Sequence, residues 1–333
     1  METEENPDLE KVKELMEECE YEEAEKILKP LFKKDPNNVE ILDYLGEIYL
    51  NIGNYKGSKK MLEKSINLKP NENPDKYMDY AQLLEIPIQR VESYKKAIEL
   101  YINNLKKNKG NKKEINNKNN DLKESISSAY ASIVSLYMTT DLCDDPNAEN
   151  ICEKSINEAL KYYPESIEAL LQLSNLRIIR KRDNEAKEAM FKILEKIKKI
   201  DNGENVDQTL PERDVLINLS QNFAELKLFK EACYVINLLI KKDDEDIESY
   251  YLLAIYEDNY CNYFSSMEAL DKFNKIYMKL QKDGELISPI LQQYVDSAKV
   301  LYNKLSKMKK DQLIDQNPEE DDNNEDMEEE EDE

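Results

Sequence analysis

Histidine and tryptophan are absent from the 333 residues, and glycine occurs only six times. Without histidine, a zinc site would need several thiolates, and the five cysteines are scattered with no C-x-x-C pair. We therefore expect no metal site, and reduced cysteines that mostly fill core positions. The sequence also lacks a histidine base, a glycine-rich phosphate loop and a G-x-S-x-G or kinase motif, which predicts a protein that is not an enzyme and needs no cofactor.

Long apolar runs are missing as well. The opening METEENPDLEKVKE is charged from its second residue, which is atypical of a secretory signal. Nowhere do eighteen apolar residues stand together, so we expect no membrane-spanning helix and no membrane partner. Together with the reduced cysteines, these absences predict a cytoplasmic and nuclear protein.

Charge is strongly unbalanced toward acid, with a formal net charge of −24 at pH 7. Residues 311–333 hold 14 Asp/Glu and no Lys/Arg, which predicts a disordered acidic tail. The rest of the chain is also acidic, with 57 acidic against 47 basic residues. Because binding nucleic acid requires Lys and Arg to neutralise phosphates, we expect a basic protein as partner and no direct contact with nucleic acid.

The composition, 40% hydrophobic and 35% charged with little glycine, favours an extended helical protein, and the sequence repeats itself. Pro70 follows Pro36 by 34 residues, as Leu62 follows Leu28. The stretch DYLGEIYLNIGNYKGSKKMLEKSINLKP resembles the L-G, Y, small, large, P pattern of tetratricopeptide repeats, whose period is about 34 residues. Small residues fit where two helices cross, and proline ends the second helix. Further copies, several imperfect, fall at residues 8–36, 77–101, 125–164, 170–190, 216–239 and 250–273.

We therefore predict an all-α tetratricopeptide-repeat solenoid of about seven helix-turn-helix units, wound as a superhelix over residues 8–310. Residues 103–120 contain eight Asn and six Lys, which predicts a disordered insertion, although the basic run also fits a nuclear-localisation patch. An amphipathic stretch at about 286–308 fits a capping helix that closes the array.

In this repeat class, positions 2, 5 and 9 of each first helix face the concave side. In the second and third units these positions are all acidic, and later units add carboxylates beside apolar residues. The helix dipole favours acid at position 2 in any helix but explains positions 5 and 9 poorly. We predict a client-binding groove formed by Glu40, Asp43, Glu47, Glu72, Asp75, Asp79, Glu168, Leu171, Asn175, Asp214, Ile217, Glu248 and Tyr251.

A carboxylate clamp of the kind that binds heat-shock chaperones does not fit these positions. Asn175 suits it, but Leu171 stands in place of the required lysine. Asp214 and Glu248 lie where cations belong. A carboxylate ligand would be repelled by this set.

The stretch TTDLCDDPNAEN, residues 139–150, departs from the period and forms an elbow between the two helices of the fourth unit. Its Asp-Asp-Pro-Asn run is a turn and helix-start signal. We expect Cys143 and Cys152 to pack in the core.

The sequence SSAYASIVSLYMTTDLCDDPNAENICEKSINEALKYYPESIEALLQLSNLRI resembles the centre of the dedicated assembly chaperones of ribosomal protein L-four of the large subunit. The likeness extends at low identity over most of residues 8–275. It departs at the extra Thr140, at Arg180 and in the absence of tryptophan. Its specific part is the elbow, with Asp141, Leu142, Cys143, Glu149, Cys152 and Glu153.

This resemblance implies a chaperone that binds the basic, newly made ribosomal protein L-four through its long internal loop. We also expect a monomer before the client binds. It would keep that client soluble until incorporation into the pre-60S ribosome. Two alternatives remain open: a general tetratricopeptide scaffold in a multiprotein complex, or an acidic chaperone of histones or other basic proteins that acts through its tail.

Overall fold

The computed structural model describes residues 7–108, 113–204, 209–284 and 286–314. Within these ranges the chain forms helices α1 to α15 and one 3₁₀ turn, η1, with no strand. The helices follow one another in antiparallel pairs, and each helix packs chiefly on its neighbours in the chain. The predicted all-α fold of about seven helix-turn-helix units is confirmed. None of the helices in the described ranges combines the length and the hydrophobicity that a membrane span requires.

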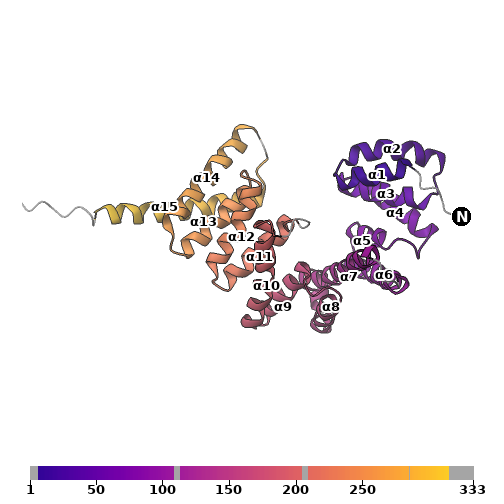
Figure 1. Ribbon diagram of the computed structural model, residues 1–333. Coiled ribbons are helices and arrows are strands. Elements are labelled where there is room, and N and C mark those ends of the chain that lie inside the picture. Colours follow the sequence, from indigo (N-terminus) through magenta and orange to yellow (C-terminus); the bar gives the residue numbers. More distant parts are fainter. Residues whose placement is uncertain (1–6, 109–112, 205–208, 285, 315–333) are drawn as a thin grey trace, which may run out of the picture. The chain divides into compact units, whose positions relative to one another are not determined.

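The chain divides into two compact units, Met1–Pro211 and Glu212–Glu333, which we call the N-terminal and C-terminal units. The successive helices of the N-terminal unit can be followed by their labels in Figure 1. Apolar side chains from successive pairs form a chain of small cores. Its helices are α1 (Pro7–Glu17), α2 (Tyr21–Lys34), α3 (Val39–Asn51), α4 (Tyr55–Leu68), α5 (Asp75–Gln82), α6 (Pro87–Lys107), α7 (Lys113–Thr139), η1 (Asp141–Asp144), α8 (Ala148–Tyr162), α9 (Ile167–Ile179) and α10 (Asp183–Asp201).

The C-terminal unit holds two helix pairs and a terminal helix around a core that includes Leu270 and Phe273. Its helices are α11 (Arg213–Glu225), α12 (Phe229–Lys242), α13 (Ile247–Asn259), α14 (Tyr263–Lys282) and α15 (Pro289–Ile314). The last of these is the cap expected at about 286–308. It buries Val295, Ala298 and Leu305 against α13 and α14. Pro289 starts it, and the Ser288 hydroxyl accepts a hydrogen bond from the Leu291 amide at 3.1 Å.

Small residues lie at the helix crossings, as the repeat pattern predicts. A Cβ on Gly46 would stand 2.5 Å from a methyl carbon of Leu62. The Ser58 hydroxyl donates to the Gly46 carbonyl at 2.7 Å, and Ser266 repeats this contact on Ala254 at 2.7 Å. Each serine therefore fits a close crossing and satisfies its own hydroxyl there.

In five units, the turn that ends the first helix has one residue in the left-handed conformation. Only one of five such turns uses glycine: the residues are Cys19, Gly53, Lys181, Lys227 and Cys261, with φ between 54° and 77°. Each turn closes with a pair of backbone hydrogen bonds that reach back three and five residues. These turns account for two of the exposed cysteines. The expectation that most cysteines fill the core is therefore wrong, since only Cys152 and Cys233 are buried.

The predicted disordered insertion at 103–120 is also wrong for the described residues. Helix α6 continues to Lys107, and α7 begins at Lys113, while residues 109–112 lie outside the described part of the chain. Lysine is a good helix former, and Leu105 and Leu122 pack against one core cluster near these helix ends. The polar residues therefore extend two helices that tertiary packing already holds. Of the expected acidic tail, residues 311–314 belong to α15, and residues 315–333 lie outside the described part.

Candidate functional site

Acidic side chains of the N-terminal unit line two pockets of about 440 Å³ each that share three carboxylates. The shared residues are Glu47, Asp75 and Asp79. We call the two pockets together the acidic groove. The structure thus brings together all seven acidic residues that the repeat positions predicted in this unit. It adds one that the sequence reasoning missed, Glu124 of α7. The carboxylates of the groove are Glu40, Asp43, Glu47, Glu72, Asp75, Asp79, Glu124 and Glu168.

Asp43 is tied into the fold and is not available in the way that the sequence suggested. Asp43 is a buried residue, only 8% exposed. One of its oxygens accepts from the Ser65 hydroxyl and the other from the Asn73 amide at 2.8 Å. Lys76, only 1% exposed, donates to the same serine at 3.2 Å and to the Lys69 carbonyl at 2.6 Å. Asp43 therefore joins α3 to α4 and to the start of α5.

The three shared carboxylates form the electrostatic centre of the groove. Burial raises the pKa of Asp79 to about 7, and repulsion from Glu47, Asp75 and Asp43 adds to this effect. The pKa of Glu47 is raised by burial and then by Asp75 and Asp43. Asp75 accepts a hydrogen bond from the Tyr101 hydroxyl. Among the described residues, no lysine or arginine forms an ion pair with Glu47 or Asp79.

The outer carboxylates of the groove are only loosely neutralised. Glu40 lies 3.9 Å from the Lys13 ammonium, and Glu72 lies 2.7 Å from Lys69. Both pairs are exposed, and such pairs contribute little stability. The pKa of Glu124 is raised by burial, with Lys196 opposing the shift. An incoming cation therefore meets a surface with excess negative charge at its centre and at its rim.

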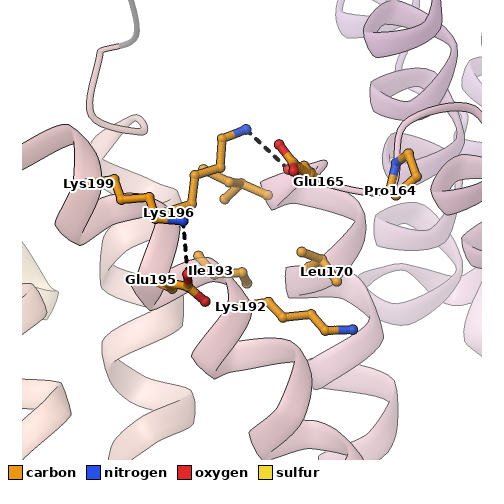
Figure 2. A pocket seen from close by; sticks show the side chains of 9 residues that line it. Pro164, Glu165, Leu170, Lys192, Ile193, Glu195, Lys196 and Lys199 are labelled. Atoms are coloured by element: carbon orange, nitrogen blue, oxygen red, sulfur yellow. Dashed lines mark hydrogen bonds and ion pairs between the residues drawn. The ribbon is translucent and has the colours of Figure 1, made fainter. Parts of the chain in front are cut away.

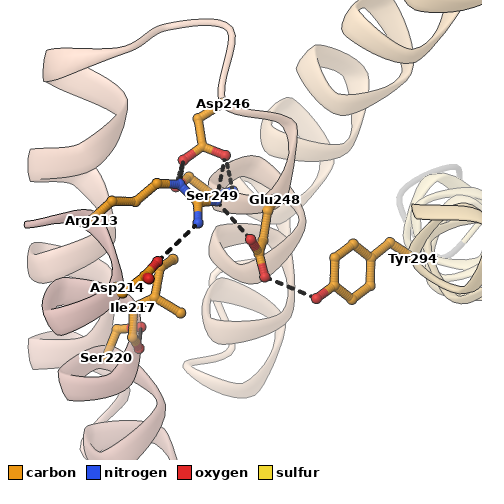
Figure 3. A network of polar contacts seen from close by, with 8 residues as sticks. All are labelled: Arg213, Asp214, Ile217, Ser220, Asp246, Glu248, Ser249 and Tyr294. Carbon is orange, nitrogen blue, oxygen red and sulfur yellow. Dashed lines mark hydrogen bonds and ion pairs between the residues drawn. The ribbon is translucent and has the colours of Figure 1, made fainter. Parts of the chain in front are cut away.

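The acidic residues of the C-terminal unit differ from those of the acidic groove, because one arginine pairs with them (Figure 3). Arg213 donates to both oxygens of Asp246 at 2.9 and 3.0 Å and to Glu248 at 2.6 Å. The other oxygen of Glu248 accepts from the Tyr294 hydroxyl at 2.9 Å. Asp214 also lies 3.9 Å from the Arg213 guanidinium, although its side chain is 95% exposed. The sequence reasoning missed Arg213, although it stands directly before a predicted groove position.

Of the remaining predicted groove residues, Leu171 and Ile217 are buried and offer no binding surface. Leu171 is 4% exposed and Ile217 is 9% exposed. Tyr251 stacks on Tyr294 with ring centroids 4.5 Å apart. Asn175 is half-buried on α9. These side chains stabilise the helix packing, so the expectation that Leu171 and Ile217 contact a client is corrected.

The elbow is a structural connection between α7 and α8. Leu142 packs on the same core as the buried Cys152, and the Thr140 hydroxyl accepts from the Leu142 amide at 3.2 Å. Burial raises the pKa of the Cys152 thiol to about 11. Cys143 and Asp141 are exposed, so the expectation that both cysteines pack is wrong for Cys143.

Ion pairs fix the helix that follows the elbow. Glu153 of α8 binds the buried Arg177 through two contacts, one of 3.0 Å. Arg177 also donates to Glu185 at 2.9 Å. Glu149 pairs with Arg180. The acidic residues of the elbow region therefore hold α8 to α9 and α10. Among the described residues, no group of three acidic or cysteine side chains is arranged to hold a metal ion.

A tetratricopeptide-repeat family model matches residues 15–83 of the chain. The solved structure of an assembly chaperone of RpL4 (Acl4), residues 1–338, superposes with a TM-score of 0.66 at 21% identity, covering 77% of this chain and 97% of that one. The chain has the tetratricopeptide-repeat fold. The crystal structure of the APC/C hetero-tetramer Cut9–Hcn1 also superposes, with a TM-score of 0.58 at 14% identity over 86% of this chain and 48% of that one.

Two curated proteins, each named a probable assembly chaperone of rpl4, are similar in sequence. The protein from Schizosaccharomyces pombe is 31% identical over 216 residues, which cover 64% of this chain and 61% of that protein. The protein from Emericella nidulans is 34% identical over 108 residues, covering 32% of this chain and 27% of that protein. The matches thus span about three fifths and about a quarter of these relatives. The resemblance that the elbow indicated is confirmed.

Proposed function

We propose that this chain is a dedicated chaperone of ribosomal protein L-four, which it binds through a basic segment in the acidic groove of the N-terminal unit. The observation that carries the proposal is the set of three shared carboxylates, two of which have no cation among the described residues. The similarity to proteins named as assembly chaperones of rpl4 supports the choice of client.

A Lys/Arg-rich segment would relieve the repulsion inside the groove. Each cation placed beside Glu47 or Asp79 stabilises the ionised carboxylate and so lowers its pKa. Because these side chains are partly withdrawn from water, their attraction to a cation is screened less than that of the rim. The groove thereby holds the segment that would otherwise bind RNA or precipitate with it.

The chaperone would keep its client soluble from synthesis until incorporation into the pre-60S ribosome. This role places the protein in the cytoplasm and the nucleus. It needs no catalysis and no cofactor, and it does not require direct contact with nucleic acid. We further propose that the chain is a monomer before the client binds.

Purification of the tagged full chain from its own cells at low salt, followed by mass spectrometry, tests the choice of client. Ribosomal protein L-four as the dominant partner is the expected result. A broad set of ribosomal proteins or histones would replace the dedicated chaperone by a general acidic one. A defined complex without L-four would leave only a tetratricopeptide scaffold.

A further inference from the structure

A pocket of different character lies between α9 and α10 of the N-terminal unit (Figure 2). Its volume is about 530 Å³, which is within the range of small-ligand and side-chain pockets. The apolar part of its lining comes from Ile167 and Leu170 of α9 and Ile193 of α10. Helix α9 begins at Ile167, so its positive N-terminal end also lies at this pocket.

Three lysines of α10, spaced at one face of the helix, line the same pocket: Lys192, Lys196 and Lys199. Within the described ranges only Lys199 forms an ion pair, with Glu195 at 2.9 Å, while Lys196 acts at longer range on Glu124 of the acidic groove. The Lys196 ammonium donates to the Glu165 backbone carbonyl at 3.2 Å and lies 5.3 Å from the centroid of the Tyr163 ring. Lys192 is exposed and has no ion pair in the described part of the chain.

Three lysines against two glutamates, Glu165 and Glu195, give this lining a net positive charge in a chain whose net charge is −24. A basic client segment suits the acidic groove and would be repelled by these lysines. The lining therefore fits a ligand of the opposite sign. The apolar side chains beside the lysines favour a ligand that carries an apolar group together with its negative charge.

We propose that this pocket docks an acidic peptide segment of a second partner protein, with one apolar side chain against Leu170 and Ile193 and carboxylates on Lys192 and Lys196. A long polyanion such as RNA fits less well, because it would extend over the acidic surface of the chain and has no aliphatic side chain to bury. A short acidic peptide meets only the local positive charge. The partner would join a pocket whose lining shares no residue with the acidic groove.

Fluorescence anisotropy of the full chain with a labelled peptide of sequence Glu-Asp-Glu-Leu-Phe-Glu-Asp-Glu tests this proposal. We expect saturable binding that the Lys192→Glu variant weakens on the order of tenfold, since it replaces an attraction by a repulsion. Lys154→Glu on α8 is the matched control, because Lys154 is exposed and does not line the pocket. This control should leave binding within about twofold of the parent chain.

The peptide with serine at its two apolar positions should bind more weakly, by about tenfold. Equal weakening by Lys154→Glu would overturn the proposal, because it would show attraction to net charge alone. Failure of the peptide to bind, or better binding of an oligouridylate of equal charge, would overturn it as well. Titration of the same variants with the basic client separates the two sites, since Lys192→Glu should not weaken client binding.

Discussion

The N-terminal and C-terminal units both carry acidic residues at predicted groove positions, yet these residues have different roles. In the N-terminal unit, Glu47 and Asp79 form no ion pair with any described lysine or arginine, and burial together with repulsion from neighbouring carboxylates raises the pKa of each. In the C-terminal unit, Arg213 binds Asp246 and Glu248. A single neighbouring cation thus decides whether a carboxylate at a groove position is free to bind a ligand or is used to hold helices together.

The pKa values express this contrast directly. Burial acts to raise the pKa of Asp246, but hydrogen bonds from Arg213 and Ser249 outweigh it and the pKa is lowered. For Asp79 burial acts in the same direction as its neighbours, and the pKa is about 7. The carboxylates of the N-terminal unit can therefore gain a favourable interaction from a basic ligand. Those of the C-terminal unit already have this interaction with Arg213.

Charge reversal in the groove should have the largest effect. With Glu47→Lys and Asp79→Lys together, we expect client affinity to fall on the order of a hundredfold or more, because two attractions become repulsions at a partly desolvated site. Asp43 is left unchanged, because its contacts to Ser65 and Asn73 belong to the fold. Isothermal titration calorimetry measures the affinity.

Two exposed carboxylates of the same unit that do not line the groove, Glu92 and Glu188, supply the control for that experiment. The variant with both reversed to lysine has the same net charge as the groove variant. Nearly unchanged binding is expected for it. An equal loss in both variants would mean that overall charge, and not the groove, carries the interaction.

Removal of the arginine should make the C-terminal unit less stable. Arg213→Gln leaves Asp246 and Glu248 without their cation, and we expect a loss of about 2 kcal/mol in the free energy of unfolding. Urea titration followed by circular dichroism measures this change. Affinity for a basic peptide should stay the same or rise slightly, since negative charge is exposed. A fall in affinity would contradict the division of roles between the two units.

Client binding should become weaker as the pH falls from 8 to 6. Asp79 has a pKa of about 7 in the free chain, and a bound cation lowers that pKa, so binding releases a proton. At a pH below 7, the client must displace this proton, at a cost in affinity of a few-fold. Calorimetry in buffers of different ionisation enthalpy detects the proton. The Asp79→Asn variant should lose most of the pH dependence; if it keeps all of it, another group is responsible.

The same shift has the opposite consequence for folding. The pKa of Asp79 is higher in the folded chain than its ordinary value of 3.8, so the folded state binds this proton more tightly. Its contribution to stability is fully present below pH 3.8 and is lost as the pH rises through about 7. Asp79→Asn should therefore stabilise the free chain more at pH 8 than at pH 5, which urea titration at the two pH values measures.

The smallest effect concerns a turn of the C-terminal unit. Lys227 has a φ of 57°. This left-handed conformation is strained for a residue with a Cβ atom and is not strained for glycine. We expect Lys227→Gly to stabilise the chain by about 0.5 kcal/mol after the entropy of the unfolded state is counted. Client affinity should not change. If urea titration shows a lower free energy of unfolding for this variant, the lysine side chain stabilises the fold by more than its backbone conformation costs.

The helix pairs could be predicted well from the sequence, because the 34-residue repeat and the positions of the apolar residues both follow from the same helix packing. Pro36 and Pro70, with Ser58 at a crossing, were sufficient to place the second unit. The acidic positions of α3 and α5 followed from the same period, and the structure gathers them. The period does not predict partners at positions that vary between units. Arg213 binds the carboxylates of Asp246 and Glu248, and Lys76 donates to the Ser65 hydroxyl, which itself donates to Asp43.

Local composition was also misleading where tertiary packing decides the outcome. Asn and Lys between residues 103 and 120 resemble a disordered linker, but packed apolar residues near them support helices α6 and α7. Cysteine is often buried, yet Cys19 and Cys261 occupy left-handed turns that glycine usually takes. A count of residue types contains no information on backbone angle.

Site-specific photo-crosslinking tests most directly that the client lies in the groove of the N-terminal unit. A benzoylphenylalanine replaces either Tyr44, which lines the acidic groove, or Asp214, a predicted groove position in the C-terminal unit whose side chain is 95% exposed. The client should crosslink from position 44 and little from position 214, although the latter is the more accessible. Efficient crosslinking from 214 without a product from 44 would contradict the account.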